Sequence, residues 1–176
     1  MKLYVARHGQ TQWNVNNMVC GSTNIPLTDF GKSQAEVLAK QLADKKIDII
    51  ISSPMLRAMQ TAHPISVAVG VTVMIDDRLR EHDYGCFEGF DRSKSEYWQQ
   101  KTQFEKKFPQ GESLLQFSHR IYSFLDDVKK AYPDKTVLLV CHGGVSRIIK
   151  TYFEDMSNDE FFNYSPENAF LAEYNL

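Results

Sequence analysis

Leu3-Tyr4-Val5-Ala6-Arg7-His8-Gly9 begins as a short apolar run and ends in a cation, an imidazole and a glycine. The apolar run predicts a β-strand, and the polar tripeptide predicts a loop at its carboxyl end. Arginine offers a planar fork of donors for phosphate oxygens, and glycine lets the backbone come close to a ligand. Histidine can attack phosphorus or move a proton near neutral pH. A buried histidine beside a surface arginine would give the same tripeptide, so its meaning depends on partners elsewhere.

The rest of the chain alternates strand-like and helical segments. After residues 3–6, strands are predicted at 47–52, 71–75, 136–141 and 170–174. Helices are predicted at 28–45 with Thr28 as cap, at 53–69 with Ser53-Pro54 as N-cap and first position, at 113–132 and at 143–152. This alternation predicts an α/β fold, a three-layer α/β/α sandwich with a mainly parallel central sheet, in one domain over residues 1–176.

The composition argues against several classes of function. A net charge of −2 argues against a general nucleic-acid binder, and no apolar run reaches the length of a membrane span. The chain starts almost at once with a strand, so we expect no signal peptide. Three cysteines, Cys20, Cys86 and Cys141, have neither a disulfide framework nor metal-ligand spacing. These features predict a cytoplasmic protein with reduced thiols and no nucleic-acid or membrane partner.

Residues 87–109 mix aromatic side chains with lysines. They could form a cap over an active site that selects the substrate, because lids commonly carry specificity. They could equally form an amphipathic helix with a solvated basic face. Both interpretations stay open at this point.

Further polar residues follow the other predicted strands. Because ligands bind outside the carboxyl ends of strands in open α/β sheets, we expect Arg7-His8-Gly9, Arg57, Glu81 and His142-Gly143 to meet at one edge. Arg57 and Gly143 fall in the first turns of predicted helices, where free N–H groups favour anions. Two histidines, two arginines and a carboxyl group at separate strand ends predict a phosphate pocket.

A competing motif lies in residues 141–147, which spell Cys-x5-Arg between a strand and a helix. This is the loop of cysteine-dependent phosphatases, in which a thiolate at a helix N-terminus attacks phosphorus. The motif is weak evidence, because a match to it often arises by chance, and it leaves Arg7, His8, Arg57 and Glu81 unexplained. Cys141 is then a small apolar residue that ends a buried strand.

The chain resembles the histidine phosphatase (phosphoglycerate mutase-like) superfamily over nearly its whole length. The matching stretches are Ala6-Arg7-His8-Gly9-Gln10-Thr11 with Trp13-Asn14, Ile25-Pro26-Leu27-Thr28 with Gly31, Ser52-Ser53-Pro54-Met55-Leu56-Arg57-Ala58 with Thr61-Ala62, Leu79-Arg80-Glu81 with Gly85 and Glu88-Gly89, Gly111-Glu112-Ser113, His142-Gly143-Gly144, and Asn168-Ala169.

The resemblance implies that His8 attacks phosphorus and becomes phosphohistidine, which water then hydrolyses. Arg7, Arg57 and a protonated His142 would surround His8 with positive charge, which disfavours its protonation and stabilises the transferring phosphoryl group. The phosphate would thus be bound by a set of six residues: Arg7, His8, Asn14, Arg57, His142 and Gly143. No metal or other cofactor is expected, because the cations replace a metal ion.

Glu81 is the expected general acid for the leaving oxygen, from its position after Leu79-Arg80. Asp83 and Glu88 are its nearest rivals. The catalytic set predicted from the sequence is therefore His8, Glu81, His142, Arg7 and Arg57.

The expected activity is metal-independent phosphomonoester hydrolysis on a small phosphorylated metabolite. The mutases of the superfamily are longer, and Met18 stands after Asn17 where mutases usually have arginine. Phosphoglycerate mutase-type transfer and a non-catalytic phosphate-binding module on the same fold remain the alternatives. The sequence does not identify the substrate or the oligomeric state.

Overall fold

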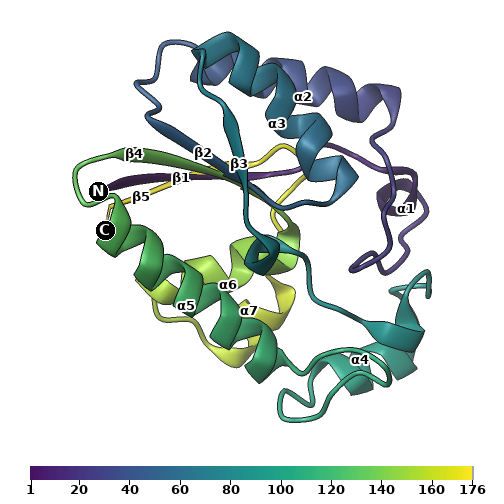
Figure 1. Ribbon diagram of the computed structural model, residues 1–176. Helices are drawn as coiled ribbons and strands as arrows, with labels where there is room; N and C mark the ends of the chain where they lie inside the picture. The colour runs from purple at the N-terminus through teal and green to yellow at the C-terminus, as the bar shows by residue number, and fades with distance from the viewer. Residues whose placement is uncertain (176) are drawn as a thin grey trace.

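A computed structural model describes residues 1–175 as a five-stranded sheet between two layers of helices (Figure 1). The strands are β1 (Lys2–Arg7), β2 (Ile49–Ser52), β3 (Val73–Ile75), β4 (Thr136–Cys141) and β5 (Leu171–Asn175). Their order is β3-β2-β4-β1-β5, and only β5 runs antiparallel to its neighbour. The predicted α/β/α sandwich with a mainly parallel sheet is confirmed.

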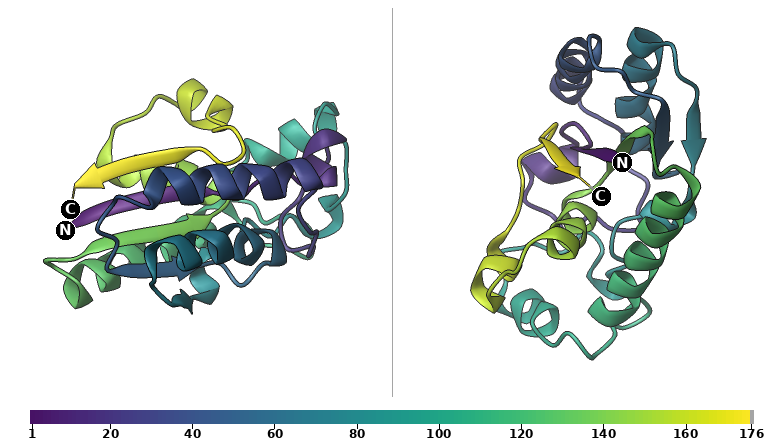
Figure 2. Two further views of the ribbon diagram at one scale, coloured as in Figure 1. Left: turned by 90° about the horizontal axis from the view of Figure 1, so that it is seen from above. Right: turned by 90° about the vertical axis from the view of Figure 1, so that its left-hand side faces the viewer.

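The helices cover both faces of the sheet. They are α1 (Gln12–Val15), α2 (Asp29–Leu42), α3 (Leu56–Val69), α4 (Ser95–Lys101), α5 (Leu114–Ala131), α6 (Gly143–Phe153) and α7 (Asn158–Asn163). Helices α2 and α3 pack on one face, and α5 and α6 pack on the other (Figures 1 and 2). Each face has its own apolar cluster, so β1 and β4 are buried on both sides, as central parallel strands should be.

Local signals set most helix starts. Thr28 caps α2, its Oγ1 accepting from the Gly31 amide at 3.0 Å, and Ser113 caps α5 through a reciprocal pair with Gln116. The predicted start of α3 is wrong: Met55, not Ser53, is its N-cap. The hydroxyl of Ser53 accepts from the Met55 amide at 3.3 Å and also contacts a histidine ring in the site described below.

The strand register brings the predicted site residues together. Arg7 pairs with Cys141, so the residues that follow, His8 and His142, leave adjacent strands at the same edge. The His8 amide donates to the Cys141 carbonyl at 2.9 Å. A β-carbon at Gly9 would lie 2.3 Å from the Gly31 carbonyl oxygen, so glycine is required for α2 to approach this loop.

Residues 87–109 contain one short helix, α4, so the helical part of this segment covers only Ser95–Lys101. Tyr97 of this segment packs with Val19, Tyr84 and Phe108 in a third apolar cluster, separate from the sheet. An isolated bridge joins Met18 to Asp91, so the segment lies against the chain after α1. Within residues 1–175, no helix combines the length and apolar character that crossing a bilayer requires.

Candidate active site

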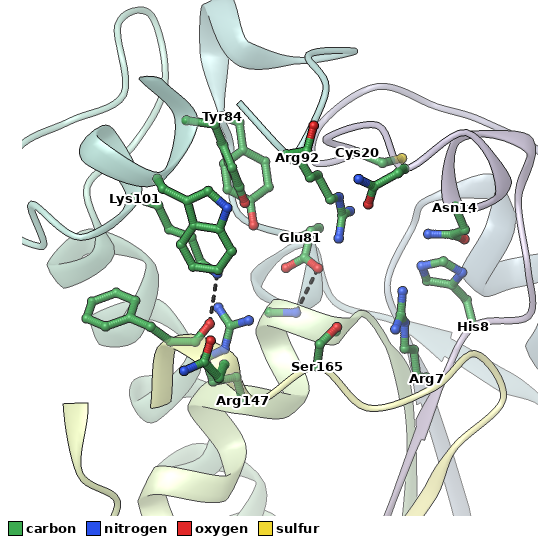
Figure 3. A pocket seen from close by; sticks show the side chains of 18 residues that line it. Arg7, His8, Asn14, Cys20, Glu81, Tyr84, Arg92, Lys101, Arg147 and Ser165 are labelled. Carbon is green, nitrogen blue, oxygen red and sulfur yellow. Dashed lines mark hydrogen bonds between the residues drawn. The ribbon is translucent and has the colours of Figure 1, made fainter. Parts of the chain in front are cut away.

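A cavity of about 420 Å³ lies beyond the carboxyl ends of the central strands (Figure 3). Five of the predicted site residues line it, namely Arg7, His8, Asn14, Glu81 and Gly143. Its other lining residues are Asn17, Cys20, Tyr84, Arg92, Ser93, Tyr97, Trp98, Lys101, Gly144, Arg147, Phe162, Asn163 and Ser165. This volume has room for a small organic molecule and not only for a phosphate ion.

His8 is held as a neutral ring in one tautomer. Its Nδ1 lies 2.7 Å from the Gly9 carbonyl oxygen, and because a carbonyl can only accept, Nδ1 carries the proton. The lone pair is then on Nε2. Burial, followed by the positive charges of Arg57 and Arg7, holds the pKa of His8 well below 6.5. A ring of this kind is a competent nucleophile at neutral pH.

Arg57 and His142 lie behind His8, and neither is among the described residues that line the cavity. Both are fully buried. Arg57 Nε donates to His142 Nδ1 at 3.2 Å, and the other ring nitrogen of His142 lies 2.8 Å from Ser53 Oγ. Nδ1 must therefore hold a lone pair.

This arrangement corrects the expectation that His142 is protonated. Burial and the charge of Arg57 hold the pKa of His142 well below 6.5, so its ring is neutral. The rings of His8 and His142 meet edge to face, with centroids 5.2 Å apart. The positive charge around His8 thus comes from the arginines and not from His142.

Arg57 also holds the loop at residues 21–23. Its terminal nitrogens donate to the carbonyl oxygens of Gly21 at 2.8 Å and Thr23 at 2.9 Å. The amides of this loop point the other way, and three of them donate to the carboxylate of Glu88 at 2.9–3.2 Å. The loop is therefore held between a buried cation and a carboxylate.

Arg7 has a buried donor without an acceptor. Its guanidinium donates to the Pro166 carbonyl, yet among the described residues its Nε is buried with no hydrogen-bond partner. Burial, followed by the charge of Arg92, lowers the pKa of Arg7 to about 10. A buried unpaired donor costs stability, and an anion in the cavity that Arg7 lines would pair with the charge of its guanidinium.

Glu81 lines the cavity and is held by two backbone amides. Its Oε1 accepts from the His82 amide at 2.9 Å, and its Oε2 accepts from the Gly144 amide at 2.8 Å. Neither rival acid is placed there: Glu88 binds the 21–23 loop, and Asp83 accepts from Gly85 and Ser22. The geometry therefore favours Glu81 as the carboxyl group that meets a ligand.

Asn14 is oriented by its surroundings. Its Oδ1 accepts from the Thr11 amide at 2.9 Å, from the Thr11 hydroxyl at 2.9 Å and from Asn168 Nδ2 at 3.2 Å. With the oxygen occupied, its Nδ2 donor is free to serve a ligand in the cavity that Asn14 lines.

Sequence reasoning missed Arg120, which holds the loop that carries Glu81. All five of its N–H groups find acceptors: the two carboxylate oxygens of Glu112 and the carbonyls of Arg78, Arg80 and Glu81. Its guanidinium also lies over the Phe117 ring, 4.6 Å from the centroid. The only sequence signal was Glu112, within the Gly111-Glu112-Ser113 motif.

We expect Arg120→Met to destabilise the protein by about 3 kcal/mol, because it removes the counter-ion of the mostly buried Glu112 carboxylate, which keeps the Asp83 amide as a donor, and it leaves three carbonyls without donors. Urea denaturation followed by circular dichroism measures this change. Arg80→Met is the matched control, since Arg80 makes an exposed ion pair with Asp77 and should change stability by less than about 1 kcal/mol. Equal destabilisation by both substitutions would contradict the role assigned to Arg120.

Three further cations line the cavity: Arg92, Lys101 and Arg147. Lysines within residues 87–109 were noted in the sequence, but nothing there indicated that Lys101 in particular would face the cavity. Arg147 stood out only as the arginine of Cys-x5-Arg. In the structure its Nε and a terminal nitrogen donate to the Tyr164 carbonyl at 3.0 and 2.7 Å.

The structure argues against Cys141 as a nucleophile. Its side chain is fully buried and is not among the cavity-lining residues described. Burial raises the pKa of the Cys141 thiol to about 12, so no thiolate forms near neutral pH. Within residues 1–175, no three His, Cys, Asp or Glu side chains cluster in a way that could hold a metal ion.

Comparison with protein families gives one match over almost the whole chain. The model of the histidine phosphatase superfamily (branch 1) matches residues 3–175. A Hydrogenobacter thermophilus protein named as a phosphoserine phosphatase is 32% identical over 187 residues, covering 99% of this chain and 89% of that protein. A Yersinia pestis protein named as a phosphoglycerate mutase is 34% identical over 150 residues, covering 81% of this chain and 70% of that protein.

Solved structures give the same fold. A Thermus thermophilus protein superposes with a TM-score of 0.78 at 29% identity, covering 98% of this chain and 92% of that one. A mycobacterial glucosyl-3-phosphoglycerate phosphatase superposes with a TM-score of 0.85 at 24% identity, covering 98% and 88%. At 24% identity, the likeness to the mycobacterial protein concerns the fold alone.

Proposed function

The chain belongs to the histidine phosphatase superfamily (branch 1), and from that premise we propose that it hydrolyses small phosphate monoesters through a phosphohistidine at His8. One observation carries the proposal. His8 presents an unprotonated Nε2 beside a cavity that Arg7 also lines, and the buried Nε of Arg7 has no acceptor among the described residues. A nucleophile and an unsatisfied anion donor at one place fit phosphoryl transfer.

In the first step, the Nε2 lone pair of His8 forms a bond to phosphorus as the bond from phosphorus to the ester oxygen breaks. Glu81, in its protonated form, gives its proton to that oxygen, so the leaving group departs as an alcohol. Arg7 and Asn14 hold the phosphoryl oxygens. The hydrogen bond from Nδ1 to the Gly9 carbonyl stabilises the positive charge that the ring acquires.

In the second step, water attacks phosphorus and the bond to Nε2 breaks. Glu81, now a carboxylate, takes a proton from the water, which regenerates the acid and releases inorganic phosphate. We propose that the positive charge of Arg57, which lies buried behind His8, stabilises the negative charge of the phosphoryl group, while neutral His142 orients Arg57. Residues 87–109 act as a cap, because Tyr97, Trp98 and Lys101 line the cavity.

Turnover of p-nitrophenyl phosphate tests the proposal. We expect hydrolysis without added metal, and no fall in kcat/KM as the pH drops from about 8 to about 6.5, because the low pKa of His8 keeps its ring unprotonated. Release of phosphate measures the reaction, and 3-phosphoglycerate isomerisation is assayed in parallel. A folded protein that is inactive toward both substrates would indicate a phosphate-binding module instead.

A further inference from the structure

The Asn168-Ala169 motif takes no part in the reaction proposed above, yet the structure places it against the site. It belongs to residues 166–170, called here the clasp, which lead into β5. The clasp holds the end of β1 and the loop after it. Its contacts are the Pro166 and Phe170 carbonyls, which accept from Arg7, and the Asn168 side chain and Ala169 amide, which donate to the His8 carbonyl.

The side-chain amide of Asn168 is oriented by main-chain carbonyl groups. Its Nδ2 lies 3.2 Å from the His8 carbonyl oxygen and 3.4 Å from the Gly9 carbonyl oxygen, and because carbonyls only accept, this end is the NH2 group. The same Nδ2 lies 3.2 Å from Asn14 Oδ1. Asn168 therefore joins the backbone of the proposed nucleophile to the side chain of a proposed phosphate ligand.

Asn14 could turn either end of its amide toward the cavity, and its neighbours decide which. The Thr11 amide, which can only donate, and Asn168 Nδ2 both face one end of the Asn14 amide, so that end is the oxygen. Figure 3 shows the Asn14 amide beside the His8 ring, with its nitrogen on the side of Glu81. The Nδ2 donor of Asn14 is thus held toward the space in front of His8.

Asn168 acts from outside the cavity, since it is not among the described residues that line it. The His8 carbonyl also accepts from the Ala169 amide, at 3.2 Å. Ala169 has a φ of 59°, a left-handed conformation that is unfavourable for a residue with a β-carbon. The clasp therefore keeps a strained backbone at the point where it meets the nucleophile, as protein chains do where the surrounding contacts fix a functional site.

We infer that Asn168 is a positioning residue, which ties Asn14 to the His8 backbone so that Asn14 Nδ2 meets a phosphoryl oxygen when His8 Nε2 meets phosphorus. This inference rests on the proposed function, since it assumes that the phosphoryl group binds between these two side chains. A misplaced donor weakens its contact in the transition state, because a hydrogen bond depends steeply on distance and angle. Without Asn168, Asn14 is held by Thr11 alone among the described residues.

A double-mutant cycle tests the inference with p-nitrophenyl phosphate, an ester that needs little proton donation from Glu81. We expect Asn168→Ala to lower kcat/KM about tenfold in the otherwise unmodified protein, but by less than about threefold in the Asn14→Ala background. The second loss is smaller because the group that Asn168 positions is already gone. A loss of about tenfold in both backgrounds, or no loss in either, would overturn the inference.

Asn16→Ala is the matched control for Asn168→Ala. The Asn16 side chain is exposed and accepts from Gln12, so its removal should leave kcat/KM unchanged. Circular dichroism checks the fold of each variant. If Asn168→Ala does not fold, Asn168→Ser, which also lacks the Nδ2 donor, takes its place in the cycle.

Binding of inorganic phosphate gives a readout that does not depend on turnover. In isotope-labelled protein followed by NMR, we expect phosphate to shift the side-chain amide signals of Asn14, which are identified by their absence from Asn14→Ala. In Asn168→Ala the shift at saturating phosphate should fall to less than about half. An equal shift in both proteins, or no shift in the unmodified protein, would contradict the positioning role.

Turnover by the unmodified protein separates this inference from the proposed function. If the unmodified protein hydrolyses p-nitrophenyl phosphate and Asn168→Ala does so equally well, the positioning role fails while the phosphatase proposal stands. If the folded, unmodified protein hydrolyses no phosphate ester, the proposed function itself fails.

Discussion

His8→Ala is expected to lower kcat for p-nitrophenyl phosphate by about 10⁴-fold or more, because it removes the group that would form the covalent intermediate. Cys20 also lines the cavity, but burial raises the pKa of its thiol and disfavours the nucleophilic thiolate. His142 lies behind His8, and its ring nitrogens are occupied by Arg57 and Ser53. Steady-state release of p-nitrophenol measures the loss. Rapid acid-free quenching of the unmodified protein with labelled substrate should capture an acid-labile phosphoenzyme.

Cys141→Ser is the matched control for the nucleophile. The thiol is buried and its pKa is raised to about 12, so its replacement should retain most of the turnover. The opposite pattern, with activity retained in His8→Ala and lost in Cys141→Ser, would move the nucleophile to the cysteine. A folded state shown by circular dichroism is required for both variants.

Glu81→Gln should slow the hydrolysis of alkyl phosphates by about 10²- to 10⁴-fold, because an alkoxide leaves only when a proton is supplied. The loss for p-nitrophenyl phosphate should be far smaller, since p-nitrophenolate is a good leaving group. Comparing kcat for the two esters isolates proton donation from any effect on binding. The glutamine also meets two backbone N–H donors with a single oxygen, so some loss common to both esters is expected.

Asp83→Asn is the control for Glu81→Gln. Asp83 accepts from the Ser22 hydroxyl and the Gly85 amide, away from the cavity, so its substitution should not change the ratio of the two rates. Equal losses for alkyl and p-nitrophenyl esters in Glu81→Gln would count against Glu81 as the acid.

The sheet and the place of the site could be predicted because both follow from local sequence. Apolar segments followed by polar residues marked β1 and β4, and parallel pairing then brought His8 beside His142. The start of α3 could not be predicted, because Ser53 has the character of an N-cap but its hydroxyl is 2.8 Å from His142 Nε2. That contact joins residues far apart in the chain, so no local pattern reports it.

The sequence also could not predict which cations of the chain line the cavity. Lys101 resembles the other lysines of residues 87–109 in sequence, but in the structure it lines the cavity and donates to the distant Phe162 carbonyl. Arg57 differs in the opposite sense: its place at a strand end suggested contact with phosphate, yet it is fully buried behind His8. Side-chain burial of this kind depends on tertiary packing.

The loop at residues 21–23 bears on how the site responds to salt. The carbonyl oxygens of the loop accept hydrogen bonds from Arg57, and its amide groups donate to the carboxylate of Glu88. These peptide groups take the place of water around Arg57, which has no counter-ion in contact with it among the described residues. Dissolved ions cannot approach this side chain, because it has no exposed surface. The electric field that Arg57 exerts on His8 should therefore persist at ionic strengths that screen the partly exposed cations of the cavity lining, Arg92, Lys101 and Arg147.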